Sequence, residues 1–350
     1  MDSSFSSVPS SYREEQVSFV TGLTGTTIER VLCLFMQLAS VTAFLKILSA
    51  RLGRWSPCFP VLEVLVMAAL PTLLVTSPLA EWPGVCLTGL TSATFVIGFI
   101  ISPHVSQLKG HDGGRNGREK GVGIANMAIT YFRACTLVLT AVCILAVDFR
   151  VFPRSLAKTE HFGVSLMDLG TGVFIFSSAL TSSYARHGGS GSRSLSSSST
   201  RKHVATNVVT LMLGFGRLVA LKATAYQEHV SEYGVHWNFF VTLFSVWTLA
   251  DVFRHLLPSD GARSLSACLI LTTYQYLLVT DCVHGEYNDL SGFIFNAGRE
   301  SSFFAANREG ICSLAGYFPL YILTEIFSRH YVFAHVTASK VIFVLSIHYP

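Results

Sequence analysis

The feature that most constrains this chain is a series of long apolar runs distributed over its 350 residues. About ten runs are present, at approximately residues 31–50, 59–77, 84–102, 127–147, 162–182, 206–221, 237–256, 264–282, 310–328 and 331–348. Each is long enough to cover most of the ~30 Å hydrocarbon layer of a bilayer. Because lipid cannot satisfy backbone polar groups, such segments fold as helices. The sequence therefore predicts an all-α, polytopic integral membrane helix bundle with about ten transmembrane helices.

The composition supports the same class. Half of the residues are hydrophobic and 13% are charged, whereas a soluble globular chain carries about 25% charged residues. With so few charged residues, a folded chain of this length has too little polar surface to be soluble in water. We therefore expect membrane lipids to surround it. The formal net charge of +4 is small, and no basic run is dense enough to indicate a nucleic-acid partner.

We expect one membrane domain, at residues 29–350, after a polar N-terminal segment at residues 1–28. That segment is rich in serine and does not resemble a cleavable signal peptide. Residues 184–203 are rich in glycine and serine, which is typical of a flexible linker. We assign no site to this stretch.

The distribution of Lys and Arg predicts the orientation of the bundle. The odd-numbered connections between runs hold fourteen of these residues, and the N-terminus and even-numbered connections hold eight. By the positive-inside rule, the odd connections face the cytoplasm and the N-terminus faces the lumen or exterior. The cytoplasmic connections carry few acids and no aromatic–polar cluster, so we interpret their basic residues as topology signals.

The ionisable and amide side chains gather in three predicted lumenal connections. These are residues 148–161, 226–238 and 284–310. Ionisable groups at a bilayer boundary usually mark a substrate or ion site. The grouping on one face predicts one shared site there.

Asp148 and Lys158 are the best candidates for chemistry. Asp148 ends an apolar run, where partial desolvation favours a general base. Pro153 favours a bent return of the chain, so that Lys158 can face Asp148 and stabilise an oxyanion or bind a phosphate. From the spacing alone, a pair of charged anchors at the membrane surface explains them equally well.

Other charged residues allow two interpretations each. His229 and His236 share a face if their segment is helical, with Glu228 beside them. Their spacing is not a recognised metal motif, so hydrogen-bonded interface residues or a headgroup site fit better than a metal. Asp168 is expected either to pair with Arg133 or Arg217 or to contact substrate.

Several blocks of sequence closely resemble one family. They are Gly22-Leu-Thr-Gly-Thr-Thr27, Leu145-Ala-Val-Asp-Phe149, Phe152-Pro-Arg154, Ala157-Lys-Thr-Glu160, Gly163-x-Ser-Leu-Met-Asp168, residues 226–240 and Asn307-Arg-Glu-Gly310. The chain resembles, from about residue 15 to 330, the inositol acyltransferases of glycosylphosphatidylinositol (GPI) anchor synthesis, the PIG-W family. Family members continue with further spans, so this chain resembles a C-terminally truncated form.

The resemblance implies an endoplasmic reticulum enzyme with a lumenal active region. It implies transfer of a fatty acyl group, typically palmitoyl, from acyl-CoA to the inositol 2-hydroxyl of glucosaminyl-phosphatidylinositol, without a further cofactor. The family's proposed acid and lysine fall on Asp148 and Lys158, which we expect to be catalytic. The expected substrate-binding residues are Arg133, Asp168, Arg217, Glu228, His229, His236, Asn238, Asn307, Arg308 and Glu309.

Two other functions remain open. A lipid transporter or scramblase would also place polar residues at one membrane face, although it would more often show paired broken helices in two halves. A non-catalytic scaffold of the GPI pathway would retain the motifs without the chemistry. The sequence does not indicate an oligomeric state.

Overall fold

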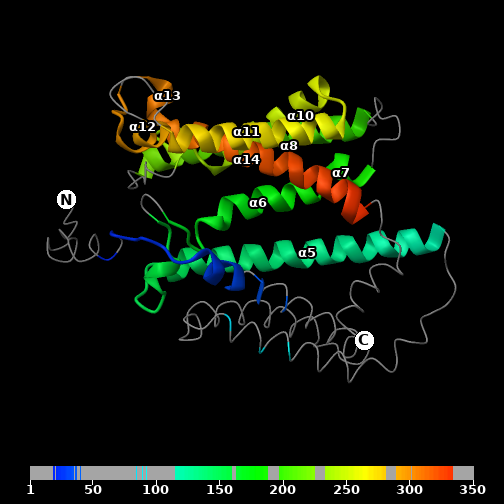
Figure 1. The fold of residues 1–350 in the computed structure, drawn as a ribbon, viewed down its shortest axis with the longest axis horizontal. Coiled ribbons are helices and arrows are strands. Elements are labelled where there is room, and N and C mark those ends of the chain that lie inside the picture. The colour runs from blue at the N-terminus through cyan, green and yellow to red at the C-terminus, as the bar shows by residue number, and fades with distance from the viewer. Residues whose placement is uncertain are drawn as a thin grey trace, which may run out of the picture. The chain divides into compact units, whose positions relative to one another are not determined.

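The computed structural model describes residues 19, 21–34, 36–37, 40, 84, 89, 92, 115–159, 163–187, 197–224, 233–280, 289–300 and 302–333. These residues form helices and turns, with one isolated β-bridge between Thr26 and Val164. The helices drawn in Figure 1 are α5 (Arg115–Ala146), η3 (Arg154–Leu156), α6 (Leu169–Leu180), α7 (Ser183–His187), α8 (Ser197–Thr224), α10 (Phe239–Leu256), α11 (Asp260–Val279), α12 (Leu290–Asn296), α13 (Phe303–Ala306), α14 (Arg308–Phe327) and η4 (Ser328–Phe333).

Four segments of these helices are long and apolar enough to cross a membrane. They are Ile129–Ala146, His203–Ala223, Phe239–Leu256 and Arg308–Phe333. The prediction of an all-α membrane bundle is confirmed. The count of about ten spans stays a prediction, because most residues of the first three apolar runs and of the last run lie outside the described residues.

The chain divides into two compact units, which are described separately. The first comprises residues 1–110 and 131–170 with Tyr349, and the second comprises residues 111–130 and 171–348 with Pro350. In the first unit, Cys135, Leu139 and Cys143 lie on one face of α5 because they are four residues apart. Phe152 and Leu156 pack on that core. The chain that follows α5 is therefore folded back against its apolar face.

The core of the second unit lies between α6, α10, α11 and α14. Small and branched residues meet there, including Ala179 of α6, Ala250 of α10, Ala267 of α11 and Ile322 of α14, each fully buried. Helix α10 contacts both α8 and α14, and α11 contacts α14, as the grouping in Figure 1 shows. Pro319 lies inside α14, which continues through it.

The glycine- and serine-rich stretch differs from the linker that we expected. Its first residues belong to α7, and its last belong to α8, which begins at Ser197. Serines seldom stop a helix that an apolar run extends, since their helix propensity is only moderately unfavourable.

Candidate active site

Asp148 lies in the turn that ends helix α5. The helix ends at Ala146, and the amide of Phe149 donates a hydrogen bond to the Ala146 carbonyl at 2.9 Å. The Asp148 side chain is exposed. The predicted base is therefore exposed and lies two residues after a helix that is long and apolar enough to cross a membrane.

Arg154 fixes the backbone on both sides of Asp148. Its guanidinium donates to the carbonyl oxygens of Val147 at 2.6 Å and Phe149 at 3.3 Å. It also lies 4.1 Å from the centre of the Phe19 ring. Burial lowers the pKa of Arg154 and the Asp148 carboxylate opposes that shift. Sequence analysis assigned Arg154 no role, although its position in a Phe-Pro-Arg block near two candidate residues was a usable signal.

Lys158 follows a segment that is locked into the core. Leu156 and Ala157 are fully buried, and Met167 donates its amide to the Leu156 carbonyl at 3.3 Å. The Lys158 side chain is half-buried. Lys158 therefore follows directly on an anchored residue.

Asp168 does not form the ion pair that we considered with Arg133. Its carboxylate accepts a hydrogen bond of 3.0 Å from the Thr159 hydroxyl, and its amide donates to the Ser165 hydroxyl at 3.2 Å. Arg133 is exposed on α5 and Arg217 is exposed on α8. The Asp168 carboxylate is therefore bonded to Thr159, the residue after Lys158.

In the second unit, Asn238 joins two helices. It is fully buried and caps α10, where its oxygen accepts from the amides of Phe240 and Val241. Its side-chain nitrogen donates to the Gly214 carbonyl of α8 at 2.9 Å. The substrate-binding role of Asn238 stays a prediction.

The segments around Gly234 and Asn307 interlock. The Asn307 side chain accepts from the His236 amide at 2.7 Å, and Val235 donates its amide to the Ala306 carbonyl at 3.0 Å. Gly234 has a φ of 108°, and a Cβ there would lie 2.5 Å from the Asn307 Cα. Asn307 is buried and joins the two segments, and its substrate-binding role stays a prediction.

The Arg308 side chain is bonded within the protein, and its substrate-binding role stays a prediction. Only 2% of it is exposed, and it donates to the carbonyls of Ile294 at 2.6 Å and Ala305 at 3.0 Å. Glu309 receives two hydrogen bonds from Arg299, at 2.6 and 3.1 Å. Arg299 was missed because ten residues separate it from Glu309 and no motif joins them.

The His236 side chain is exposed and stacks on Phe303, with 6.3 Å between the ring centres. It lies in a bend between Tyr233 and Phe239, so the helical face imagined for His229 and His236 is wrong at this end. Glu228 and His229 lie outside the described residues. Of the predicted residues described in this part of the chain, His236 is exposed, whereas the Glu309 carboxylate is bound by Arg299.

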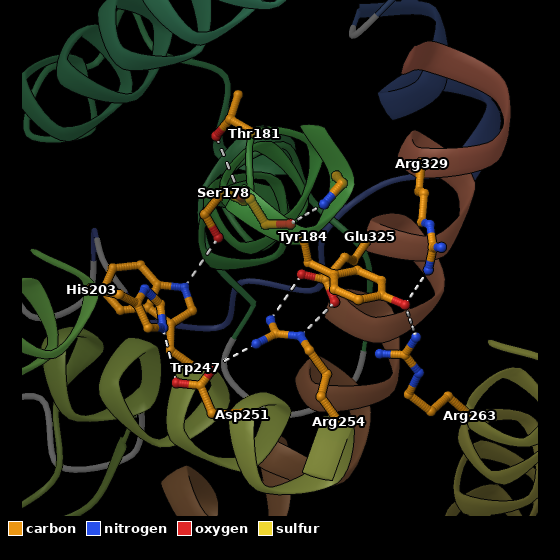
Figure 2. Close-up of polar contacts among 12 residues, drawn as sticks. Ser178, Thr181, Tyr184, His203, Trp247, Asp251, Arg254, Arg263, Glu325 and Arg329 are labelled. Carbon is orange, nitrogen blue, oxygen red and sulfur yellow. Dashed lines mark hydrogen bonds and ion pairs between the residues drawn. The ribbon is translucent and has the colours of Figure 1, made fainter. Parts of the chain in front are cut away.

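A further polar cluster lies at the predicted cytoplasmic ends of the second unit's helices (Figure 2). The Tyr184 hydroxyl donates to Asp260 at 2.8 Å and accepts from Arg263 and Arg329. Arg254 donates to Glu325 and to Asp251. This contradicts the expectation that these connections hold no aromatic–polar cluster. The arginines interpreted as topology signals are also internal ion-pair partners.

The described candidates thus form two groups. Asp148, Lys158 and Asp168 belong to the first unit, and His236 and Glu309 belong to the second. That the two groups share one site stays a prediction.

Comparison with known proteins gives the family. The GWT1 family model matches residues 12–343. GPI-anchored wall transfer protein 1 of Gibberella zeae is 33% identical over 337 residues, covering 89% of this chain and 64% of the relative. The protein of the same name from Emericella nidulans is 32% identical, with 89% and 66% covered. The Saccharomyces cerevisiae protein is 41% identical over 202 residues, with 55% and 38% covered.

The chain thus spans about two thirds of the length of the Gibberella and Emericella relatives. The match extends over the blocks that hold both groups of candidate residues. The chain belongs to the GWT1 family.

Proposed function

We propose that this chain is the acyl-transferring part of a membrane-bound O-acyltransferase of GPI-anchor synthesis. Its acceptor would be the inositol 2-hydroxyl of glucosaminyl-phosphatidylinositol, and its donor would be a long-chain acyl-CoA such as palmitoyl-CoA. The reaction would take place in the endoplasmic reticulum membrane, on the lumenal side. Family membership and the names of the relatives support the pathway.

One observation carries the chemical part of the proposal. An exposed carboxylate, Asp148, follows a membrane-crossing helix, and Arg154 holds the carbonyls on both sides of it. The same folded loop presents Lys158 after buried Ala157. A carboxylate and an ammonium on one anchored loop are the groups that direct acyl transfer requires.

In the proposed reaction, Asp148 accepts the proton of the inositol hydroxyl as its oxygen attacks the thioester carbonyl. A new C–O bond forms, and negative charge develops on the carbonyl oxygen, which the Lys158 ammonium stabilises. The C–S bond then breaks. The proton from Asp148 passes to the leaving thiolate, so that CoA leaves as a thiol and the carboxylate is restored.

The acyl chain would lie against the apolar surface beside this loop. Exposed apolar side chains near the end of α5 include Ile144, Leu145, Phe149 and Val151. Such a surface at the bilayer boundary suits a lipid substrate better than a soluble one.

The test is transfer of labelled palmitate from palmitoyl-CoA to glucosaminyl-phosphatidylinositol in microsomes that lack the endogenous acyltransferase. Mass spectrometry of the lipid product locates the acyl group. The proposal requires label on the inositol ring. A chain that restores anchor synthesis only together with a catalytic partner, and that retains this property without Asp148, would be a scaffold instead. Movement of the lipid between leaflets without acylation would indicate a scramblase.

A further inference from the structure

We propose that Asp168 is a positioning residue that sets the place of Lys158 through the hydroxyl of Thr159. This inference rests on the acyl transfer proposed above, in which Lys158 must meet the developing oxyanion. It differs from the sequence-based expectation, in which Asp168 contacts substrate or pairs with an arginine.

The hydroxyl and the amide of Thr159 both face the Asp168 carboxylate. Its hydroxyl donates to Asp168 Oδ2 at 3.0 Å, and its amide lies 3.5 Å from the same oxygen. Asp168 is itself fixed, because its amide donates to the hydroxyl of fully buried Ser165 at 3.2 Å. The acceptor for Thr159 is therefore part of a rigid turn.

The methyl group of Thr159 is enclosed by two glycines. A Cβ at Gly25 would lie 2.7 Å from the Thr159 Cγ2, and a Cβ at Gly163 would lie 2.9 Å from it. Both glycines have positive φ values, 77° and 145°. The amide of Thr26 donates to the Val164 carbonyl at 2.8 Å, which joins the two glycine-containing segments. Thr159 is thus held on its polar side by Asp168 and on its apolar side by the glycines.

Lys158 lies between two anchored neighbours as a result. Ala157 is fully buried on one side, and Thr159 is bonded on the other. This arrangement fixes the backbone from which the lysine side chain extends. A displacement of about 1 Å in a group that contacts the reacting atoms can reduce the rate about a hundredfold. Loss of the Thr159–Asp168 hydrogen bond would therefore lower the rate of acyl transfer by displacing Lys158.

The two glycines leave space only for a small side chain at residue 159. Thr159→Val keeps the methyl that the glycines enclose and removes only the donor. Thr159→Ser keeps the donor and removes the methyl. Asp168→Asn keeps an acceptor oxygen and removes the charge, whereas Asp168→Ala removes both. These four variants separate positioning by a hydrogen bond from direct action of the Asp168 charge on substrate.

We expect kcat for acyl transfer to fall about tenfold or more in Thr159→Val and Asp168→Ala, with KM for acyl-CoA changed less than about twofold. Thr159→Ser and Asp168→Asn should stay within about threefold of the parent chain. The double variant with Thr159→Val and Asp168→Ala should be no slower than the slower single variant, because both remove one interaction. An Asp168→Asn variant as slow as Asp168→Ala would overturn the proposal, since charge and not bonding would then matter.

A readout without catalysis is the labelling of Lys158 by an amine-reactive ester, measured by peptide mass spectrometry with exposed Lys222 as the internal control. Thr159→Val and Asp168→Ala should change the Lys158 labelling rate, while leaving that of Lys222 unchanged.

An unchanged Lys158 labelling rate in folded variants would overturn the positioning role. If the parent chain transfers no acyl group but its Lys158 labelling responds as described, the proposed reaction is wrong and the positioning stands. If Thr159→Val fails to fold, the comparison of kcat between Asp168→Asn and Asp168→Ala still tests whether the hydrogen bond or the charge of Asp168 matters.

Discussion

Arg254 near the end of α10 forms a two-pronged ion pair with Glu325 near the end of α14. Its Nε lies 3.0 Å from Oε2 and its Nη2 lies 2.8 Å from Oε1, although 71 residues separate the two. The Glu325 side chain is fully buried. The pair therefore ties two candidate membrane-crossing helices together at one end.

Removing only one member of this pair should be costly. Arg254→Met would leave Glu325 as an uncompensated buried carboxylate, so we expect a loss of about 3–5 kcal/mol in the free energy of unfolding. The double variant Arg254→Met with Glu325→Leu should lose less than Arg254→Met alone. Thermal melting of the purified chain in detergent measures both. A double variant that is less stable than either single one would contradict this account.

Gly310 should not tolerate a side chain. A Cβ at this position would run into the Trp237 ring, whereas a Cβ at Gly316, in the same helix α14, would meet nothing within 4 Å. Gly310→Ala should therefore destabilise the chain by about 1–3 kcal/mol. Gly316→Ala should be neutral or slightly stabilising, since alanine favours a helix. Equal melting temperatures for the two variants would show that Trp237 moves aside freely.

The Tyr184 cluster should lose stability in acid. Burial raises the pKa of Asp260, but the hydrogen bonds from His330 and Tyr184 and the charges of Arg329 and Arg263 outweigh it and lower the pKa below its usual value. A group whose pKa is lowered by folding stabilises the protein above its unfolded pKa, here about 4, and loses that effect as pH falls below it.

We therefore expect the melting temperature to fall between pH 5 and about pH 3, and to fall less in Asp260→Asn. Glu300→Gln is a matched control, because Glu300 is exposed. An equal fall in Asp260→Asn and the parent chain would rule out Asp260 as a source of the acid sensitivity.

Arg154 should matter to catalysis through the turn that it holds. Arg154→Lys keeps the charge but loses the planar guanidinium, whose Nη2 donates to Val147 and Phe149 and whose Nε donates to Phe152. We expect a fall of about tenfold or more in kcat. Arg150→Lys provides the comparison at an exposed position of the same turn. If the two variants transfer acyl groups equally fast, Arg154 does not position Asp148.

The apolar runs predicted the helix bounds well where a helix and its apolar run have the same length. The run at residues 237–256 became α10 at Phe239–Leu256. Helix α5 begins at Arg115 and not at residue 127, because a helix can extend past its apolar part into polar sequence. The run at residues 162–182 begins instead with a turn that includes Gly163 and Asp168, and α6 starts at Leu169. The start of α6 therefore follows the hydrogen bonds of the turn, in which Asp168 bonds to Ser165 and Thr159, and not the start of the apolar run.

The candidate residues could be chosen from their residue type and their position beside apolar runs. Their roles could not be predicted, because these depend on contacts between segments that are far apart in the sequence. Asn238 and Arg308 are polar residues beside apolar runs, and nothing local distinguishes a cap or a buried clamp from a ligand. Arg254 and Glu325 are paired across 71 residues. For Asp168 we expected either an arginine partner or substrate contact, and the bond to Thr159 was not predicted because threonine is uncharged and lies in a loop.

The most direct test of the central claim compares the parent chain with Asp148→Asn in the microsomal acyl-transfer assay. The exposed Glu300→Gln variant serves as the control for loss of a carboxylate. The account predicts labelled inositol-acylated lipid from the parent and the control, and a loss of about a hundredfold or more in Asp148→Asn. Full activity in a folded Asp148→Asn variant would contradict the account, because no general base would then be required at this position.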